Sequence, residues 1–297
     1  MDQALLLPLA TLTPVALLLL FHAGLRRSLA PTRTTEGGTP AAVGIPARDL
    51  WLPGKNGKRL FAWYAPATAT VPSERTPAIV LLHGWGGNAG HMLPLAARLH
   101  AAGHTVLLLD ARNHGRSDED RFSSMPRFAE DLGCALDWLN LQAEAETDPH
   151  QIAVIGHSVG AAAALLSASR RTDIAAVVSI AAFAHPESIM RRFLAAKRIP
   201  FLPFGWYALR YVEYVIGYRF ESIAPENTIR RAHCPVLLVH GTEDETVPAS
   251  DAEHLAARSD GRAQLLLMRG HHEGFENIDE GVRAVLEFLA GTAKPST

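Results

Sequence analysis

The feature of this sequence that most limits its fold is a regular alternation of short apolar runs with stretches of helical composition. The apolar runs lie at 78–82, 105–110, 152–155, 175–180, 236–240 and 263–268. The helical stretches lie at 91–102, 125–142, 161–170, 250–258 and 278–290. Short, nearly continuous apolar runs are typical of parallel strands that are buried on both faces. Their alternation with helices predicts an α/β protein with a mostly parallel, doubly wound sheet.

The segments before this alternation differ in composition. The run "LWLPGKNGKRLFAWYAP" has two apolar stretches around a Pro-Gly-Lys-Asn-Gly turn, which predicts an antiparallel hairpin at the start of the domain. Residues 26–48 are rich in Pro, Gly and Thr and show no periodicity, so we expect a linker there. The α/β domain is therefore expected over 49–292.

Residues 186–231 interrupt the alternation, because they contain no clear strand and are apolar, aromatic and basic. This length exceeds an ordinary strand-to-helix loop and predicts an insertion of short helices that covers the active site as a lid. A packed connector is the alternative. The same composition also fits a surface that lies against a membrane. That hypothesis is the weaker one, because apolar residues of a lid are expected over a pocket in any case.

The N-terminal segment 3–25, "QALLLPLATLTPVALLLLFHAGL", contains no Asp, Glu, Lys or Arg. It is long enough to cross the hydrocarbon core, and it predicts a transmembrane anchor over 1–25. A cleaved signal peptide and a soluble helix are the alternatives, but the start lacks the basic residues of a signal peptide. Arg26, Arg27 and Arg33 follow the segment, which places the domain in the cytoplasm by the positive-inside rule.

Charge and cysteine content exclude several classes of function. The 28 basic and 30 acidic residues nearly balance and form no long basic run, so nucleic-acid binding is not expected. Cys134 and Cys234 are far apart in the sequence and are expected to be reduced, with a disulfide as the less favoured alternative. No metal-ligand motif occurs among the 14 histidines, and we expect neither a metal nor a cofactor.

One strand-to-helix junction carries a candidate nucleophile. In "QIAVIGHSVGAAAALLSA" an apolar β-branched run leads through Gly-His-Ser-Val-Gly into an alanine-rich helix. A serine on such a sharp turn, here Ser158, is pushed out of the sheet with its hydroxyl exposed. Gly156 and Gly160 leave room for the tight backbone. Taken alone, the pattern fits a Gly-rich turn of a parallel sheet equally well.

Other reactive residues also follow predicted strands. The loop "HGWGGN" follows the first apolar run, "HGTEDETVP" carries Asp244, and "RGHHEGF" carries His271 and His272. In parallel sheets ligands bind where the strands end, so these loops are expected to meet Ser158. The order serine, acid, histidine is the one that a nucleophile elbow requires.

With these motifs, with "DARNHGRSD" and with "PVLLVHGTEDETVP", the chain resembles the α/β-hydrolase-fold serine hydrolases. It is most similar to their serine aminopeptidase-like and Bem46-like members, over about residues 50 to 290. The resemblance implies an α/β-hydrolase fold with a short helical lid. It also implies hydrolysis of an ester, thioester, amide or peptide bond through an acyl-enzyme.

The resemblance also assigns roles. Ser158 would be the nucleophile, a histidine its general base, and Asp244 the acid that orients the histidine. The backbone N–H groups of Trp85 and Val159 would form the oxyanion hole. Asp244 matches the acid position better than its neighbours Glu243 and Glu245. Counting from the strand end favours His272 as the base, whereas a simple Gly-His match favours His271.

The expected function is that of a membrane-anchored serine hydrolase that cleaves the ester of a small lipophilic acyl substrate. A peptidase or a thioesterase of the same fold is the alternative, because one triad serves every acyl transfer. A non-catalytic binding module is a second class of hypothesis, and it is less favoured because no triad position or elbow glycine is missing. A metal-dependent hydrolase is a third, and it lacks a ligand set at suitable spacing.

Overall fold

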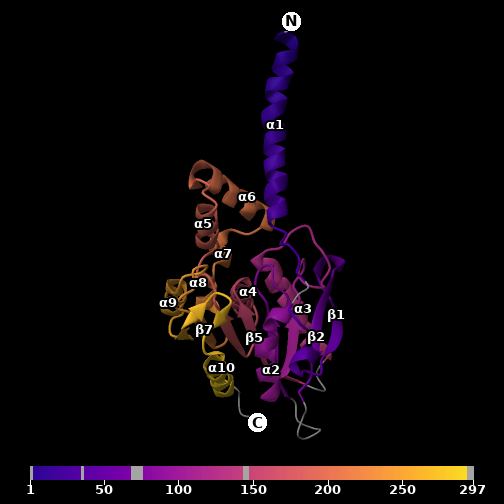
Figure 1. The fold of residues 1–297 in the computed structure, drawn as a ribbon, viewed down its shortest axis with the longest axis vertical. Helices are drawn as coiled ribbons and strands as arrows, with labels where there is room; N and C mark the ends of the chain where they lie inside the picture. Colours follow the sequence, from indigo (N-terminus) through magenta and orange to yellow (C-terminus); the bar gives the residue numbers. More distant parts are fainter. Residues whose placement is uncertain (1–2, 35–36, 68–75, 143–146, 293–297) are drawn as a thin grey trace.

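The computed structural model describes residues 3–34, 37–67, 76–142 and 147–292. Within these ranges, the side chains of 3–14, 76–77, 142 and 147–151 lie outside the described part. Figure 1 shows a sheet wrapped by helices, with one long helix and a helical insertion standing out from the same end of the molecule.

The centre of the fold is an eight-stranded sheet of order β1-β2-β4-β3-β5-β6-β7-β8. The strands are β1 (Arg48–Pro53), β2 (Arg59–Ala65), β3 (Thr76–Leu82), β4 (Thr105–Leu109), β5 (Thr147–His157), β6 (Ala176–Ile180), β7 (Val236–Gly241) and β8 (Ala263–Met268). β1 and β2 pair antiparallel, as the hairpin motif predicts, and β2 pairs antiparallel with β4. Every other pairing is parallel. The predicted mostly parallel α/β sheet is therefore confirmed.

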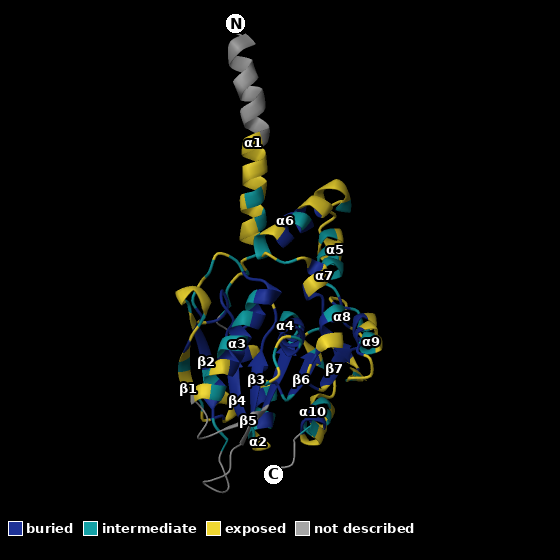
Figure 2. Ribbon diagram, turned by 180° about the vertical axis from the view of Figure 1, so that it is seen from behind, coloured by how far each residue is buried: buried dark blue, intermediate teal, exposed yellow. Residues whose placement is uncertain are grey.

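Alternate residues of the strands feed two separate cores, one on each face of the sheet. On β3, Val80 and Leu82 join the core under α3 (Met125–Gln142), α4 (Val159–Ala168) and α9 (Ala249–Arg258). Ile79 and Leu81 join the other core, under α2 (Leu93–Ala101) and α10 (Ile278–Thr292). Because both faces are covered, the central strands β4, β6 and β7 are buried along almost their whole length (Figure 2). The edge strands β1 and β8 expose several of their residues.

The insertion between β6 and β7 is helical, as predicted, and no strand occurs in its described residues. Its elements are α5 (Pro186–Ala196), η4 (Phe201–Gly205), α6 (Trp206–Ile216), α7 (Phe220–Ile223), α8 (Pro225–Thr228) and η5 (Ile229–Arg231). α5 and α6 stand away from the sheet, while α7 and α8 return to the body of the domain (Figures 1 and 2).

The N-terminal segment forms one helix, α1 (Gln3–Ser28), whose last turns contact α6. The Arg26 Nε atom donates a hydrogen bond of 2.7 Å to the Tyr211 hydroxyl, and the His22 ring stacks on the Tyr211 ring at 4.0 Å. Within the described residues, no helix combines the length and apolar character that a membrane crossing requires. The transmembrane helix predicted over 1–25 is therefore not found, and the side chains of residues 1–14 lie outside the described part.

Cys134 and Cys234 are both unpaired, as predicted for reduced thiols. Cys234 lies in the core on the α3 side, and burial raises the pKa of its thiol to about 12. A thiol with so high a pKa stays protonated at neutral pH and behaves as a small apolar side chain.

The packing of α3 on the sheet predicts how substitutions on this helix change the free energy of unfolding. Leu132 on this helix is fully buried, whereas Leu141 on the same helix is 71% exposed. Leu132→Ala should lower the free energy of unfolding by about 2–5 kcal/mol, because it leaves a cavity in the core. Leu141→Ala should change it by less than about 0.5 kcal/mol. Urea unfolding followed by circular dichroism measures both, and equal losses would contradict this packing.

Candidate active site

Ser158 lies at a turn so tight that only glycine fits two residues before it and two residues after it. Its backbone has φ 53° and ψ −115°, between the end of β5 and the start of α4. A Cβ atom on Gly156 would lie 2.4 Å from the backbone carbon of Gly160, and a Cβ on Gly160 would lie 2.5 Å from the Leu82 carbonyl oxygen. The backbone N–H of Ser158 donates to the Ile180 carbonyl at 2.8 Å, which ties the turn to β6. The elbow geometry expected from the sequence is therefore present.

The structure brings Ser158, His272 and Asp244 into one hydrogen-bonded chain. His272 Nε2 lies 3.1 Å from Ser158 Oγ, and His272 Nδ1 lies 2.7 Å from Asp244 Oδ2. A carboxylate only accepts, so Nδ1–H donates to Asp244, and Nε2 is left to accept the serine hydroxyl proton. The Asp244 side chain is fully buried and the His272 side chain is 12% exposed.

Asp244 is held as a carboxylate by its neighbours. Burial alone would raise its pKa, but hydrogen bonds from His240, His272 and the backbone N–H of Val247 outweigh burial and hold the pKa well below its usual range. Its Oδ1 atom accepts from the N–H groups of Thr246 and Val247 at 2.9 and 2.8 Å. The negative charge is therefore fixed where it faces the histidine.

The structure distinguishes the two neighbouring histidines. His271 points away from Ser158, because its Nδ1 atom is 2.9 Å from the Glu243 carbonyl oxygen and its side chain is 73% exposed. His272 lies at the turn between two short strands, β9 (Gly270–His271) and β10 (Gly274–Phe275), which aim it at the serine. Among the neighbouring carboxylates, Glu243 instead pairs with Arg269 at 3.0 Å.

The two predicted oxyanion amides lie beside the serine. Val159 is the first residue of α4, so its N–H has no partner in the preceding turn of helix. Trp85 follows Gly84, where an added Cβ would lie 3.2 Å from the Ser158 Cβ. Within the described part of the chain, neither the Trp85 nor the Val159 N–H donates to a protein acceptor. Both are therefore open to a ligand oxygen.

A buried polar network braces the loop that carries Trp85. The Asp110 carboxylate accepts from the N–H groups of Ala89 and Arg116, each at 2.7 Å. His83 donates through Nδ1 to the Gly84 carbonyl at 2.7 Å and accepts through Nε2 from the Ala111 N–H at 3.1 Å. The motifs "HGWGGN" and "DARNHGRSD" are thus fastened to each other.

The chain that follows α1 also reaches this loop, which the composition of a linker does not indicate. Thr34 Oγ1 donates to the Gly86 carbonyl at 2.9 Å, and Asn88 Nδ2 donates to the Thr34 carbonyl at 3.1 Å. Arg33 donates to the Gly115 carbonyl at 3.0 Å. Sequence reasoning missed this support, because a threonine in a Pro- and Gly-rich run carries no distinctive signal.

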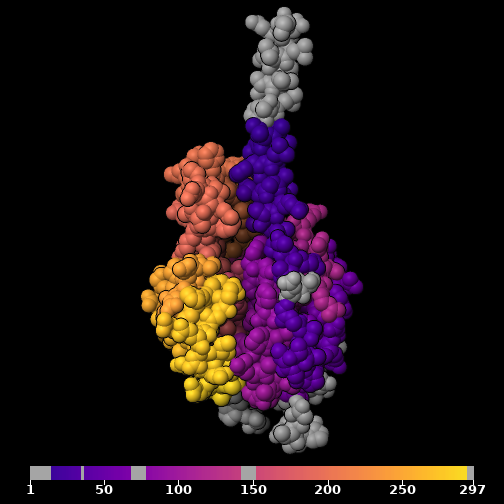
Figure 3. All heavy atoms as spheres, viewed as in Figure 1, coloured from indigo at the N-terminus to yellow at the C-terminus, as the bar shows by residue number. Residues whose placement is uncertain are grey.

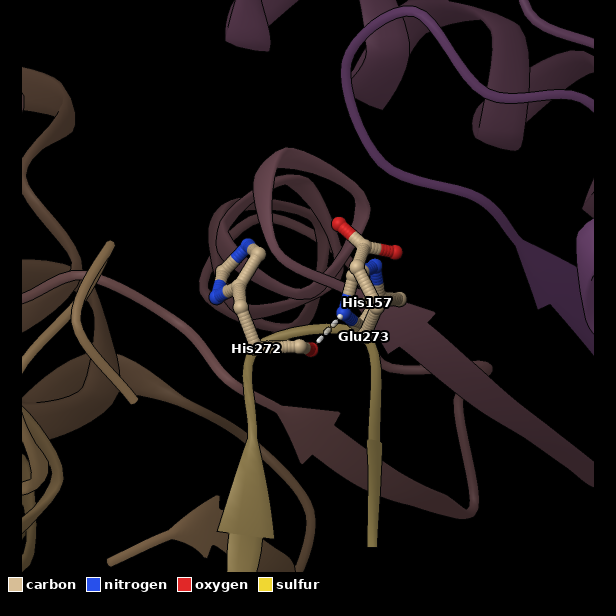
Figure 4. A group of neighbouring side chains, drawn as sticks. All are labelled: His157, His272 and Glu273. Carbon is tan, nitrogen blue, oxygen red and sulfur yellow. Dashed lines mark hydrogen bonds between the residues drawn. The ribbon is translucent and has the colours of Figure 1, made fainter. Parts of the chain in front are cut away.

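His157, beside the nucleophile, connects the elbow to the loop of the catalytic-base candidate. Its Nε2–H donates to the backbone carbonyl of His272 at 2.8 Å, and Glu273 lies next to its ring (Figure 4). From the sequence alone, His157 is expected only to pack beside the nucleophile. Its position next to Ser158 indicates that it lies near the site. The neighbouring sequence does not indicate which atom its ring contacts.

Two groups of side chains lie close enough to be considered as metal ligands. In the first, His157, His272 and Glu273, both ring nitrogens of His272 are already engaged by Ser158 and Asp244. A metal there would break one of these bonds.

The second group is His185, Glu221 and Glu226. His185 Nδ1 accepts from the Glu187 N–H at 3.1 Å, so the proton of the neutral ring sits on Nε2, 3.4 Å from Glu221. A metal-bound histidine needs the opposite arrangement, with its second nitrogen donating. The donor sets of these two groups therefore do not favour a metal.

The buried histidines of the braced loops predict a pH dependence of stability. Burial lowers the pKa of His83 to about 4 and that of His114 to about 3, and among the described residues His114 Nε2 has no hydrogen-bond partner. The unfolded chain gains these protons below about pH 6.5, whereas the folded chain stays neutral. The free energy of unfolding should thus fall as the pH drops from about 6.5 to 4, by up to about 1.4 kcal/mol per pH unit for each histidine.

Urea titrations at successive pH values measure this slope. His114→Phe should make it shallower, and the exposed His233→Gln serves as the control for loss of a histidine. A slope that is the same in His114→Phe and in the wild type would contradict the assignment.

The comparisons with known proteins agree with this fold and its motifs. The family model described as "Serine aminopeptidase, S33" matches residues 73–210. The Mycobacterium tuberculosis protein Rv2307c, uncharacterized, is 30% identical over 264 residues, covering 87% of this chain and 85% of its own. The α/β hydrolase domain-containing protein WAV2 of Arabidopsis thaliana is 27% identical over 231 residues, covering 75% and 70%.

Among solved structures, the Pyrococcus furiosus esterase Pf2001 superposes with a TM-score of 0.69 at 22% identity, over 88% of this chain and 98% of that one. A Mycobacterium tuberculosis puromycin-hydrolyzing peptidase superposes with a TM-score of 0.65 at 21% identity, over 84% and 39%. These likenesses show the fold. Together with the matching family model and the relatives, they establish that the chain belongs to the α/β-hydrolase-fold serine hydrolases of the serine aminopeptidase S33 family.

Proposed function

We propose that this protein hydrolyses a carboxylic ester or a related acyl bond through an acyl-enzyme on Ser158. The observation that carries the proposal is the chain of hydrogen bonds from Asp244 through His272 to Ser158, at 2.7 and 3.1 Å. A serine hydroxyl is a weak nucleophile unless a base takes its proton, and His272 Nε2 lies within reach of that proton.

The geometry supports the following sequence of steps. Ser158 Oγ attacks the substrate carbonyl while His272 takes its proton, and Asp244 stabilises the imidazolium that forms. The N–H groups of Trp85 and Val159 bind the oxygen on which negative charge develops. His272 then gives the proton to the leaving group, and the acyl-enzyme forms. A water molecule activated by His272 releases the acid and restores Ser158.

A small, lipophilic acyl substrate is the one that we favour. The insertion over 186–231 supports it, because α5, η4 and α6 carry exposed apolar and aromatic side chains such as Phe193, Leu202 and Phe204. A peptidase or a thioesterase would use the same residues, and the structural neighbours include an esterase and a peptidase. A non-catalytic binding module has no need of an aligned Ser-His-Asp chain, so the geometry favours an enzyme.

We also propose that the protein works at a membrane, with the domain in the cytoplasm. The support is in the sequence, where residues 3–25 contain no Asp, Glu, Lys or Arg and are followed by Arg26, Arg27 and Arg33.

Labelling with a fluorophosphonate probe tests the nucleophile. The wild type should be labelled covalently, because the serine oxygen displaces fluoride from the probe and forms a phosphonate ester only when a neighbouring base removes its proton. Ser158→Ala should not be labelled, and gel fluorescence measures both. The control is the folded state of each protein, followed by circular dichroism. Folded wild-type protein that takes up no probe would overturn the proposed function.

Paired alanine variants test the choice of base. His272→Ala should lower kcat for a p-nitrophenyl ester by about 10⁶-fold, because Ser158 then has no proton acceptor. His271→Ala should leave kcat close to the wild-type value, since that side chain is exposed and bonded to Glu243. Initial rates with purified protein measure both. The reverse ranking would mean that the loop rearranges to use His271.

A further inference from the structure

We propose that the exposed end of the lid is a binding surface for an anionic lipid bilayer. We call residues 193–207, which join α5 to α6, the lid tip. This surface lies outside the triad, and its binding to lipid does not depend on catalysis. Three observations carry the proposal: the apolar side chains that the lid tip exposes, its unpaired positive charges, and the direction in which it projects.

The lid tip exposes large apolar side chains that have no cover. Leu202 is 71% exposed, Phe193 63%, Phe204 61%, Trp206 50% and Ile199 42%. Single exposed apolar residues are common on protein surfaces, but a group of them within one short segment marks an interaction site. Phe, Leu and Trp side chains at the tip of a projecting element are those that favour the boundary between lipid headgroups and acyl chains.

The same segment carries positive charge without compensation. No acidic residue occurs between Glu187 and Glu213 in the sequence. Arg192 and Arg210, nearer the body of the domain, pair with Asp251 and Glu213. Lys197 and Arg198 lie exposed at the tip, and no salt bridge to either occurs within the described residues. Lys197 Nζ lies 5.8 Å from the centroid of the exposed Phe193 ring, and both cations remain accessible to the phosphate groups of lipid.

The direction of α1 shows which way the lid tip faces. α1 and α6 project from the same end of the molecule and touch there (Figures 1 and 3). The Phe21 and Tyr207 rings are 6.1 Å apart, and His22 Nε2 lies 2.8 Å from the Tyr207 hydroxyl. Beyond this contact, α1 exposes Val15 and the run 17–20, which is all leucine. One lipid surface at this end would therefore cover both apolar elements.

Charge favours a bilayer over a second copy of the chain as the occupant. Two lid tips packed face to face would bring Lys197 and Arg198 of both copies together, and these like charges repel. An anionic bilayer supplies both an apolar layer for Leu202, Phe204 and Trp206 and phosphates for the two cations. If the proposed esterase activity holds, a lipid-bound lid would bring a lipophilic substrate to the entrance of the site.

Quenching of Trp206 by brominated lipid tests the surface in the full chain. The protein is placed in vesicles of brominated phosphatidylcholine, with or without phosphatidylglycerol, and in the same vesicles without bromine. The difference in emission between the wild type and Trp206→Phe is the emission of Trp206 alone. We expect brominated lipid to quench this Trp206 emission, most strongly in the anionic vesicles. The matched control is Trp51→Phe, because Trp51 is 42% exposed on β1, away from the lid, and its emission should not respond to bromine.

Charge variants complete the test. Lys197→Gln with Arg198→Gln should weaken docking of the lid on anionic vesicles by roughly 30-fold, which lowers the quenching of Trp206. Arg230→Gln with Arg231→Gln removes two adjacent exposed cations at the root of the insertion and should leave the quenching unchanged. Three results would each overturn the proposal. Trp206 could stay unquenched, its quenching could be the same in both double variants as in the wild type, or the lid tips of two copies could cross-link to each other. Fluorophosphonate labelling is read separately, so loss of the proposed function would not imitate any of these results.

Discussion

The close approach of α4 to the ends of β3 and β5 is the constraint on which the site depends. Gly160 lies where any side chain would strike the Leu82 carbonyl, and Gly156 faces the backbone of Gly160. Because the helix can start this close to the strands, Ser158 is forced into a left-handed conformation that costs roughly 1–3 kcal/mol and is held by the surrounding sheet. This backbone conformation turns the hydroxyl out of the sheet, where His272 can reach it.

The other reactive groups are brought to this serine by polar contacts rather than by the apolar cores. Asp110 fastens the loop of Trp85, His157 holds the backbone of His272, and His240 lies 3.4 Å from Asp244. The first two contacts join residues at the ends of different strands, so they form only when the sheet is assembled, whereas His240 and Asp244 are only four residues apart in the chain. Buried polar groups that are satisfied in this way rigidify a site, because each would be costly to leave unpaired.

The N-terminal segment contacts both the insertion between β6 and β7 and the loop of Trp85. The last turns of α1 contact α6 through His22 and Arg26, and Thr34, a few residues later, reaches the loop of Trp85. One continuous length of chain therefore joins α6 to the loop that lies beside Ser158.

The sequence by itself determined the alternation of strands and helices, the hairpin before them and the serine elbow. These follow from local rules: apolar runs form buried strands, alanine-rich runs form helices, and glycine alone fits the tight junction. It also placed Ser158 and Asp244 after strands, where the ends of a parallel sheet bring residues together. Ser158 and Asp244 were therefore candidates for the nucleophile and the acid before any contact was known.

Only the tertiary structure decided between His271 and His272. Adjacent residues of an extended chain point to opposite sides, and which side faces Ser158 depends on the short β9–β10 turn, which has no strand signature in the sequence. Tertiary structure likewise decides two other contacts, the packing of residues 31–34 on the loop that carries Trp85 and the hydrogen bond from His157 to His272. A hydrogen bond between residues more than a hundred positions apart leaves no mark on local sequence, because it depends on where the sheet carries each end.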